Sequence, residues 1–306
     1  MASTVLVTGA TGCQGFATAR HLLAAGVHVH ALVRDPSKAN AVELERRGAK
    51  LCVGAFDDHD SLVAAAHGTS AVFLNVLPTF PDVESELQHA RNVIHAASEA
   101  GTVASIIYSS VTMTGKHETF PGWGPDYPLA WYWTSKAAIE SLVRSWGFKY
   151  WTILRPAFLM HNYLSPVADH LFPALPQDHV FRTAYQPDSP MTVLDPDDVG
   201  RFATAAIVDP DRYNHHEIDL GVQALKPRDI ARILSQASGK DIQVEFYTTD
   251  EAASLAKVNP MISAQLWSNE VGYQVDQDAL KKYPIRLTTF EEYLQREKGA
   301  VQTTFG

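Results

Sequence analysis

Short apolar segments alternate with amphipathic segments along the first half of the chain. Ser3 to Val7 and Val27 to Val33 are rich in the β-branched residues that favour strands, and Ala71 to Val76 is typical of a buried strand. Two other segments carry apolar residues at helical spacing: Phe16 to Ala25, which follows the first strand, and Pro81 to Ala100, which follows the last of these three. Strands that alternate with helices in this way predict an α/β fold with a doubly wound parallel sheet.

The same alternation continues to about residue 155 and resumes after residue 190. Further strands are predicted at Lys50 to Val53, Ser105 to Ser110, Tyr150 to Leu154, His216 to Leu220 and Gln243 to Tyr247, and further helices at Pro36 to Gly48, Asp57 to His67, Ala130 to Trp146, Asp195 to Ala206 and Pro227 to Gly239.

Proline interrupts the pattern between residues 157 and 190, which we therefore expect to form a loop with short helices. Thr112 to Leu129 is also expected to be irregular. We predict a dinucleotide-binding Rossmann domain at residues 1–155, completed by about 190–224. Residues 156–189 and 225–306 would form a smaller substrate-binding lid.

The composition describes an ordinary globular protein. The net charge of −9 over 306 residues argues against binding to a nucleic-acid backbone. No run of residues is apolar enough for a membrane helix, and the N-terminus lacks the features of a signal peptide. Two cysteines make no disulfide framework, so we expect a cytoplasmic protein. We also expect it to be a monomer or a homodimer and to act on a small molecule.

A glycine-rich turn follows the first strand and opens the first helix. Gly9 would form the tight turn, Gly12 would let the backbone approach a pyrophosphate, and Gly15 would let the helix pack closely. The alternative is an ordinary strand-to-helix turn. The residues predicted to bind a dinucleotide here are Thr8, Gly9, Thr11, Gly12, Cys13, Gln14 and Gly15.

The end of the second strand predicts which dinucleotide is bound. Arg34 is followed by Lys38, and an arginine at this place pairs with a ribose 2′-phosphate. Asp35 would instead accept a hydrogen bond from a 2′-hydroxyl. NADP(H) is therefore the preferred cofactor and NAD(H) the alternative, unless these charges form only a solvated helix start.

Three side chains suggest carbonyl reduction. Tyr132 and Lys136 are four residues apart on a predicted helix and share one face. A lysine one turn away would lower the pKa of the phenol and bind the nicotinamide ribose. Ser110, with Thr112 in reserve, would hold the carbonyl oxygen. Alternatively, Tyr132 packs in an aromatic lid and Lys136 binds ribose only.

Aromatic residues gather around the start of this helix. Trp123, Trp131 and Trp133 would line a flat pocket for an aromatic substrate, with Phe158 and Tyr163 as the opposite wall. They would otherwise anchor a long loop on the core. The histidines have no cysteine or carboxylate partners at a recognised ligand spacing, so no metal is expected.

Four motifs stand out along the chain: TGATGCQG at residues 8–15, LVRDP at 32–36, LRPAFLMHN at 154–162 and DPDDVGR at 195–201. With them, the sequence resembles the short-chain dehydrogenase/reductase superfamily and, within it, the NmrA-like family. Asn92 and Gly239-Lys240 extend the resemblance over almost the whole chain.

The resemblance implies further cofactor contacts. Pro156 and Phe158 would line the nicotinamide end, and Asn75 and Val76 the ribose and pyrophosphate. The family usually has a Gly-Asp pair after the third strand, where this chain has Gly54-Ala55. The Phe56 backbone and Asp57 or Asp58 would then serve the adenine instead.

The family includes reductases of small molecules, many in secondary metabolism, and non-catalytic regulators that bind NAD(P) and typically lack the tyrosine. Because Tyr132 is present, the sequence favours an NADP(H)-dependent reductase of a ketone or quinone on a small aromatic molecule. The alternatives are an NADP(H)-sensing regulator that acts through a protein partner, and an enzyme that reduces a carbon–carbon double bond or an imine.

Overall fold

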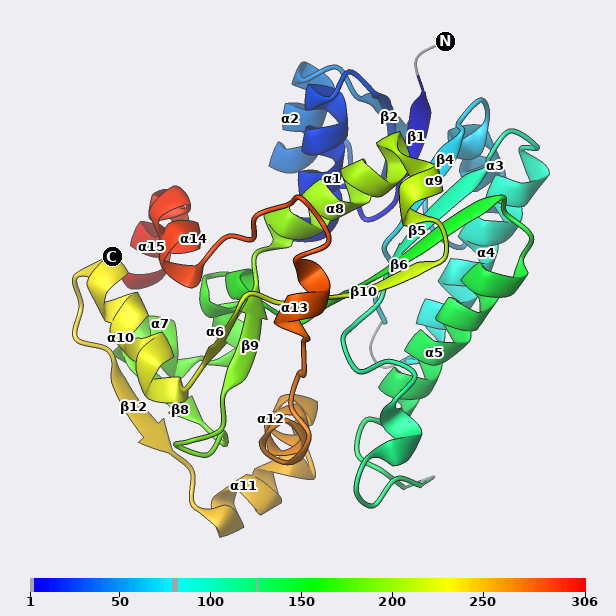
Figure 1. The fold of residues 1–306 in the computed structure, drawn as a ribbon. Helices are drawn as coiled ribbons and strands as arrows, with labels where there is room; N and C mark the ends of the chain where they lie inside the picture. The colour runs from blue at the N-terminus through cyan, green and yellow to red at the C-terminus, as the bar shows by residue number, and fades with distance from the viewer. Residues whose placement is uncertain (1–2, 79–81, 125) are drawn as a thin grey trace. The chain divides into compact units, whose positions relative to one another are not determined.

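The computed structural model describes residues 3–78, 82–124 and 126–306, and the chain divides into two compact units (Figure 1). Unit 1 comprises Met1–Thr114, Trp131–Arg155 and Pro196–Asp219, and unit 2 comprises Gly115–Ala130, Pro156–Asp195 and Leu220–Gly306. The segment Gly115–Ala130 thus groups with unit 2, although the sequence places it within the first domain.

A seven-stranded sheet forms the centre of unit 1, in the order β10-β6-β5-β4-β1-β2-β3. Neighbouring strands from β6 to β3 are all parallel. The chain order reverses between β1 and β4, and such switch points are where doubly wound sheets bind ligands. The predicted fold class is confirmed. The strands are β1 Thr4–Val7, β2 His28–Val33, β3 Lys50–Val53, β4 Ala71–Leu74, β5 Ser105–Ser109, β6 Tyr150–Pro156 and β10 His216–Leu220.

Helices cover both faces of this sheet (Figure 1). On one face, α3, α4 and α5 bury apolar side chains such as Leu62, Ile94 and Ile139 against the strands. On the other face, α1 packs against α8, where Gly200 lies against the Ala17 backbone. The helices are α1 Cys13–Ala24, α2 Ala39–Arg46, α3 His59–Ala66, α4 Ser85–Glu99, α5 Ala130–Ser145, α8 Pro196–Val208 and α9 Pro210–Tyr213.

Each of these elements except the short α9 was predicted within a few residues. The predicted start of the long helix, Pro81, lies outside the described residues, and α4 begins at Ser85. Between residues 112 and 129 the described regular structure is one turn of 3₁₀ helix, His117–Thr119, and α5 begins directly afterwards at Ala130, which agrees with the irregular segment expected there.

Unit 2 contains small sheets that the sequence did not predict. Strand β9 pairs with β7 in parallel and with β11 antiparallel, and β8 pairs with β12 in parallel. Residues 157–190 therefore contain strands as well as short helices. The strands are β7 Phe158–Leu159, β8 Val180–Thr183, β9 Met191–Leu194, β11 Gln223–Leu225 and β12 Gln243–Phe246.

The helices of unit 2 enclose an aromatic core. Tyr163, Phe172, Phe181 and Phe290 are at most 3% exposed and contact one another. No helix among the described residues is long and apolar enough to cross a membrane. The helices are the 3₁₀ turn Met160–Tyr163, α6 Ala168–Leu171, α7 Ala174–Asp178, α10 Pro227–Ser238, α11 Thr249–Ala256, α12 Pro260–Glu270, α13 Gln277–Leu280, α14 Phe290–Arg296 and α15 Lys298–Phe305.

Candidate functional site

The glycine-rich turn between β1 and α1 leaves no room for side chains at two positions. Gly9 has a φ of +59°, which L side chains rarely adopt. A Cβ on Gly15 would lie 2.2 Å from the Gly9 carbonyl oxygen. Gly12 is the N-cap of α1, and the described first turn of this helix carries no acidic side chain. The helix therefore presents backbone N–H groups, which suits a phosphate.

Neighbouring strands hold this turn in place. The buried Thr8 hydroxyl donates to the Phe73 and Asn75 carbonyl oxygens at 3.1 and 3.2 Å, and accepts from the Asn75 N–H at 2.8 Å. The Ser109 hydroxyl donates to Gln14 Oε1 at 2.6 Å. Thr8 and Asn75 thus use polar groups to join β1 to β4, and Val76 beyond them is 1% exposed.

At the end of β2 the charges differ in their surroundings. The Asp35 carboxylate accepts hydrogen bonds from the Ser37 N–H at 2.9 Å and from its hydroxyl at 2.6 Å. These bonds lower the pKa of Asp35 and turn its carboxylate toward Ser37. Arg34 and Lys38 are both exposed. This arrangement suits a ribose phosphate better than a ribose hydroxyl.

Side chains of α3 and α4 contact the segment that follows β3. A Cβ on Gly54 would lie 2.3 Å from the Ser61 hydroxyl oxygen, so glycine is required there. Asn92 of α4 donates through Nδ2 to the Phe56 carbonyl oxygen at 2.8 Å. Asp58 caps α3 by accepting from the Ser61 N–H at 3.2 Å, whereas Asp57 is exposed.

After β5, the two hydroxyls proposed for the carbonyl oxygen lie in different bonding environments. Ser110 is 5% exposed and its hydroxyl donates to Thr114 Oγ1 at 3.3 Å, a long bond that a better acceptor could displace. The Thr112 hydroxyl donates to the Arg155 carbonyl oxygen at 2.6 Å and is fully buried. Ser110 is therefore the better candidate of the two.

On α5, Lys136 forms a buried ion pair. Its Nζ lies 2.6 Å from Glu86 Oε1, with 4% of the lysine side chain and none of the glutamate side chain exposed. The Ser135 hydroxyl donates to the other Glu86 oxygen at 3.1 Å. Nζ also lies 5.7 Å from the Tyr132 ring centroid and 5.9 Å from that of Tyr108 on β5.

This ion pair changes the expected protonation chemistry. Burial raises the pKa of the Tyr132 hydroxyl, and the Glu86 charge raises it further. Burial alone would lower the pKa of Lys136, but the charges of Glu86 and Tyr108 and the hydrogen bonds to them together outweigh burial, and the pKa is raised. The predicted lowering of the tyrosine pKa by lysine is therefore wrong, because the lysine charge is paired with Glu86.

Glu86 is the residue of this site that sequence reasoning missed. One feature of the sequence could have indicated its burial. Glu86 falls on the same apolar stripe of α4 as the buried Ala90, Val93 and Ala97. A carboxylate on an apolar stripe needs a buried cation. The partner, Lys136, lies fifty residues away and could not be identified from the sequence.

The aromatic residues do not form one wall. Trp131 is half-buried and lines a hollow of about 700 Å³ between the segment that leads into α4 and the outer side of α5. Trp133 and Tyr163 are 1% and 0% exposed, which contradicts their predicted substrate contacts because these side chains fill the protein core. Phe158, half-buried, packs on Tyr163, and Trp123 packs on Tyr127, both within unit 2.

The candidate residues of unit 1 share one edge of its sheet. The glycine turn, Arg34, Phe56, Asn75 and Ser110 each follow the carboxyl end of a parallel strand, the edge where α/β sheets bind ligands. Pro156, Phe158, Trp123 and Tyr163 belong to unit 2.

Comparison with known proteins agrees with this architecture. The model of the NmrA-like family matches residues 1–294. The chain is 30% identical over 262 residues to (4-alkanoyl-5-oxo-2,5-dihydrofuran-3-yl)methyl phosphate reductase of Streptomyces griseus. This alignment covers 85% of the present chain and 83% of the relative. It is 28% identical over 253 residues to NAD(P)H azoreductase of Xenophilus azovorans, covering 81% and 78% respectively.

Solved structures show the same fold in proteins of two kinds. An NADPH-dependent quinone oxidoreductase from Escherichia coli, complexed with NADPH, has a TM-score of 0.73 at 22% identity and covers 96% of this chain and 99% of its own. NmrA, a negative transcriptional regulator in complex with NADP, has a TM-score of 0.74 at 23% identity and covers 98% and 97%. At these identities the structural likeness establishes the fold alone.

Proposed function

Because the chain belongs to the NmrA-like family, we propose that it is an NADP(H)-dependent reductase that acts on a ketone or quinone carbonyl of a small aromatic molecule. The relatives named as NAD(P)H azoreductase and as a dihydrofuranyl-methyl phosphate reductase support a reductase of small molecules. We place the activity in the cytoplasm, where cysteines such as Cys13 and Cys52 stay reduced, and in secondary metabolism.

The residues around the glycine turn fit a dinucleotide. The uncapped N-terminus of α1 and the side-chain-free Gly9 and Gly12 would hold the pyrophosphate. Arg34 and Lys38 would hold a 2′-phosphate, which favours NADP(H) over NAD(H). Phe56, Asp57, Asn75, Val76, Lys136, Pro156 and Phe158 are the further residues we assign to this cofactor, which supplies a hydride when bound.

The single observation that carries the proposal is the placement of Tyr132 one turn from Lys136 on α5, with its ring centroid 5.7 Å from Lys136 Nζ. Burial and the Glu86 charge raise the pKa of its hydroxyl, so the phenol carries the proton that the reduced oxygen would receive. Ser110 would hold the carbonyl oxygen that receives this proton. Lys136, held by Glu86, whose other oxygen accepts from Ser135, would orient the ribose rather than activate the tyrosine.

One observation favours a second function, that of an NADP(H)-sensing regulator acting through a protein partner. The ion pair between Lys136 and Glu86 gives the lysine a structural role that needs no catalysis. NmrA, a regulator of the same fold, is known in complex with NADP. The two functions make the same prediction for cofactor binding and opposite predictions for turnover.

The test pairs Tyr132→Phe with Tyr150→Phe, a control at the amino end of β6. Each protein is titrated with NADPH and NADH, then assayed for NADPH oxidation with quinones, aromatic ketones, azo compounds, enones and imines. We expect tight NADPH binding by all three proteins and turnover by wild type and Tyr150→Phe only. Binding without turnover by wild type would favour the regulator. Equal turnover by Tyr132→Phe would remove Tyr132 from the mechanism.

A further inference from the structure

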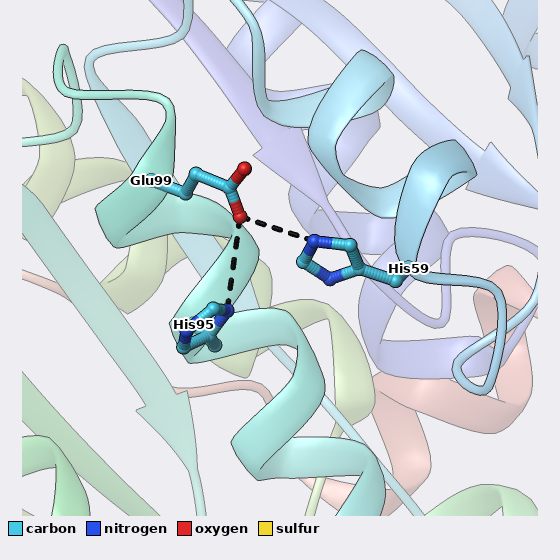
Figure 2. A group of neighbouring side chains, drawn as sticks. All are labelled: His59, His95 and Glu99. Carbon is cyan, nitrogen blue, oxygen red and sulfur yellow. Dashed lines mark ion pairs between the residues drawn. The ribbon is translucent and has the colours of Figure 1, made fainter.

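Two histidines and a glutamate converge on the surface of unit 1, where the start of α3 meets the end of α4. His59 Nε2 lies 3.1 Å from Glu99 Oε2, and His95 Nδ1 lies 3.8 Å from the same oxygen (Figure 2). One potential ligand atom from each of the three residues lies within 4.8 Å of the other two. No metal is expected from the histidine spacing in the sequence, and His59 is distant along the chain from His95 and Glu99.

Helix geometry brings these side chains together. His95 and Glu99 are four residues apart on α4, so they project from one face about one turn apart. His59 is the first residue of α3, which Asp58 caps and which packs on α4. Figure 2 shows His59 reaching across from α3 toward the Glu99 carboxylate. Two adjacent helices thus contribute to one cluster.

Two of the three separations between ligand atoms are close to those of a tetrahedral metal site, and the two histidine nitrogens lie within 4.8 Å of each other. Zinc binds imidazole nitrogen and carboxylate oxygen at about 2.1 Å, so two ligand atoms on one tetrahedral ion lie about 3.4 Å apart. The observed separations of 3.1 and 3.8 Å lie on either side of this value. The side chains are 50%, 62% and 49% exposed for His59, His95 and Glu99, so small rotations can adjust the geometry.

A hollow beside the cluster leaves space for a further ligand. It measures about 420 Å³ and is lined by His59 and Glu99 together with Asp60 and His67, which carry additional donor atoms. A fourth ligand, either a water or one of these side chains, would complete a tetrahedron. Two imidazoles and one carboxylate are the ligand set of zinc and similar transition metals rather than of Mg²⁺ or Ca²⁺.

We propose that His59, His95 and Glu99 form a binding site for a divalent transition-metal cation of the zinc class, which links the start of α3 to the end of α4. The site is independent of the proposed reductase activity. The bound cation would replace the contacts that both histidines now make with Glu99. Because it binds the folded chain, it would also stabilise unit 1.

The test uses tag-free protein, because a histidine tag would bind the same cations. ZnCl₂ is titrated by calorimetry into wild type, His59→Gln, His95→Gln and Glu99→Gln. His170→Gln is the control, since His170 is also exposed but lies on α6 in unit 2. All five are first compared by circular dichroism. These exposed positions should tolerate glutamine without loss of the fold.

We expect wild type and His170→Gln to bind one equivalent of Zn²⁺ and to melt at a higher temperature in its presence. Each cluster variant should bind Zn²⁺ about tenfold more weakly or worse, because it removes one of three protein ligands. X-ray absorption of the wild-type complex should show two imidazoles and an oxygen ligand. Absence of Zn²⁺ binding to wild type, or equal binding by wild type and the cluster variants, would overturn the proposal.

Discussion

Arg34 is the side chain that we expect to set the cofactor preference. It is exposed directly after β2, while the neighbouring Asp35 is held by Ser37. Arg34→Ala should raise the Kd for NADPH about tenfold, as expected for a lost charge-assisted pair, and leave the Kd for NADH unchanged. Fluorescence titration measures both constants. Arg46→Ala, which removes an exposed arginine paired with Glu43 on α2, is the control. A parallel loss of NADH affinity would contradict this assignment.

The buried pair of Lys136 and Glu86 offers a second prediction at this scale. Lys136→Met leaves an uncompensated carboxylate in the core and should lower the free energy of unfolding by about 3–5 kcal/mol. The double variant Glu86→Leu/Lys136→Met removes both charges and should recover most of this loss. Urea unfolding followed by circular dichroism measures each step. If the double variant is less stable than Lys136→Met, the pair does not act as a unit.

The site residues that could be predicted from the sequence are those whose positions depend on one short segment of chain. Gly9 and Gly15 are set by the path of one turn, and Arg34 by its place directly after a strand. Glu86 was missed because its burial depends on a lysine from another helix, and the meeting of His59 with Glu99 depends on how α3 packs on α4. Such pairings are fixed by tertiary packing, which no local spacing records.

Helices α1 and α8 show how closely two elements of unit 1 pack. A Cβ on Gly200 would lie 2.7 Å from the Ala17 carbonyl carbon, in the backbone of the facing helix. At the same interface Asp197 of α8 pairs with Arg20 and His21 of α1. Since α1 also begins at the glycine turn, its position on α8 bears on the candidate cofactor site.

Gly200→Ala should therefore separate α1 from α8 and lower the free energy of unfolding by about 1–3 kcal/mol, the range seen for overpacked cores. It should also weaken NADPH binding, since it displaces the helix N-terminus. Gly299→Ala is the matched control, because the Cβ there meets open space and alanine favours helix. Thermal unfolding and NADPH titration of both variants provide the measurement. Equal stability of the two would show that the helices can move apart without cost.

The elements of unit 1 were predictable and several of unit 2 were not. Strands such as β1 and β2 have a regular pattern of β-branched residues and lie beside amphipathic helices that share their core. By contrast, β7 has two residues, and β8 pairs with β12 from sixty residues further on. The two residues of β7 are too few to show a hydrophobic period, and β8 is defined by pairing with a strand that lies far along the chain.

At the scale of the whole molecule, neither unit is a continuous piece of chain. The chain passes between the units five times, at residues 114–115, 130–131, 155–156, 195–196 and 219–220. Each unit thus contains segments whose ends are held by the other unit, and unfolding of one unit would release those ends. We expect the two units to unfold in one cooperative transition, although each has its own core.

This coupling predicts that NADPH, which we assign mainly to unit 1, stabilises both units. A ligand at a hundredfold excess over its Kd adds about 2.7 kcal/mol to the free energy of unfolding of every segment that unfolds only globally. Hydrogen exchange should therefore slow in α10 of unit 2 as well as in β1 of unit 1 when NADPH is added. NADH at the same concentration is the control and should protect less. If exchange slows in unit 1 alone, the two units unfold separately. Stabilisation of unit 1 by NADPH would then not extend to unit 2 through the five connecting positions.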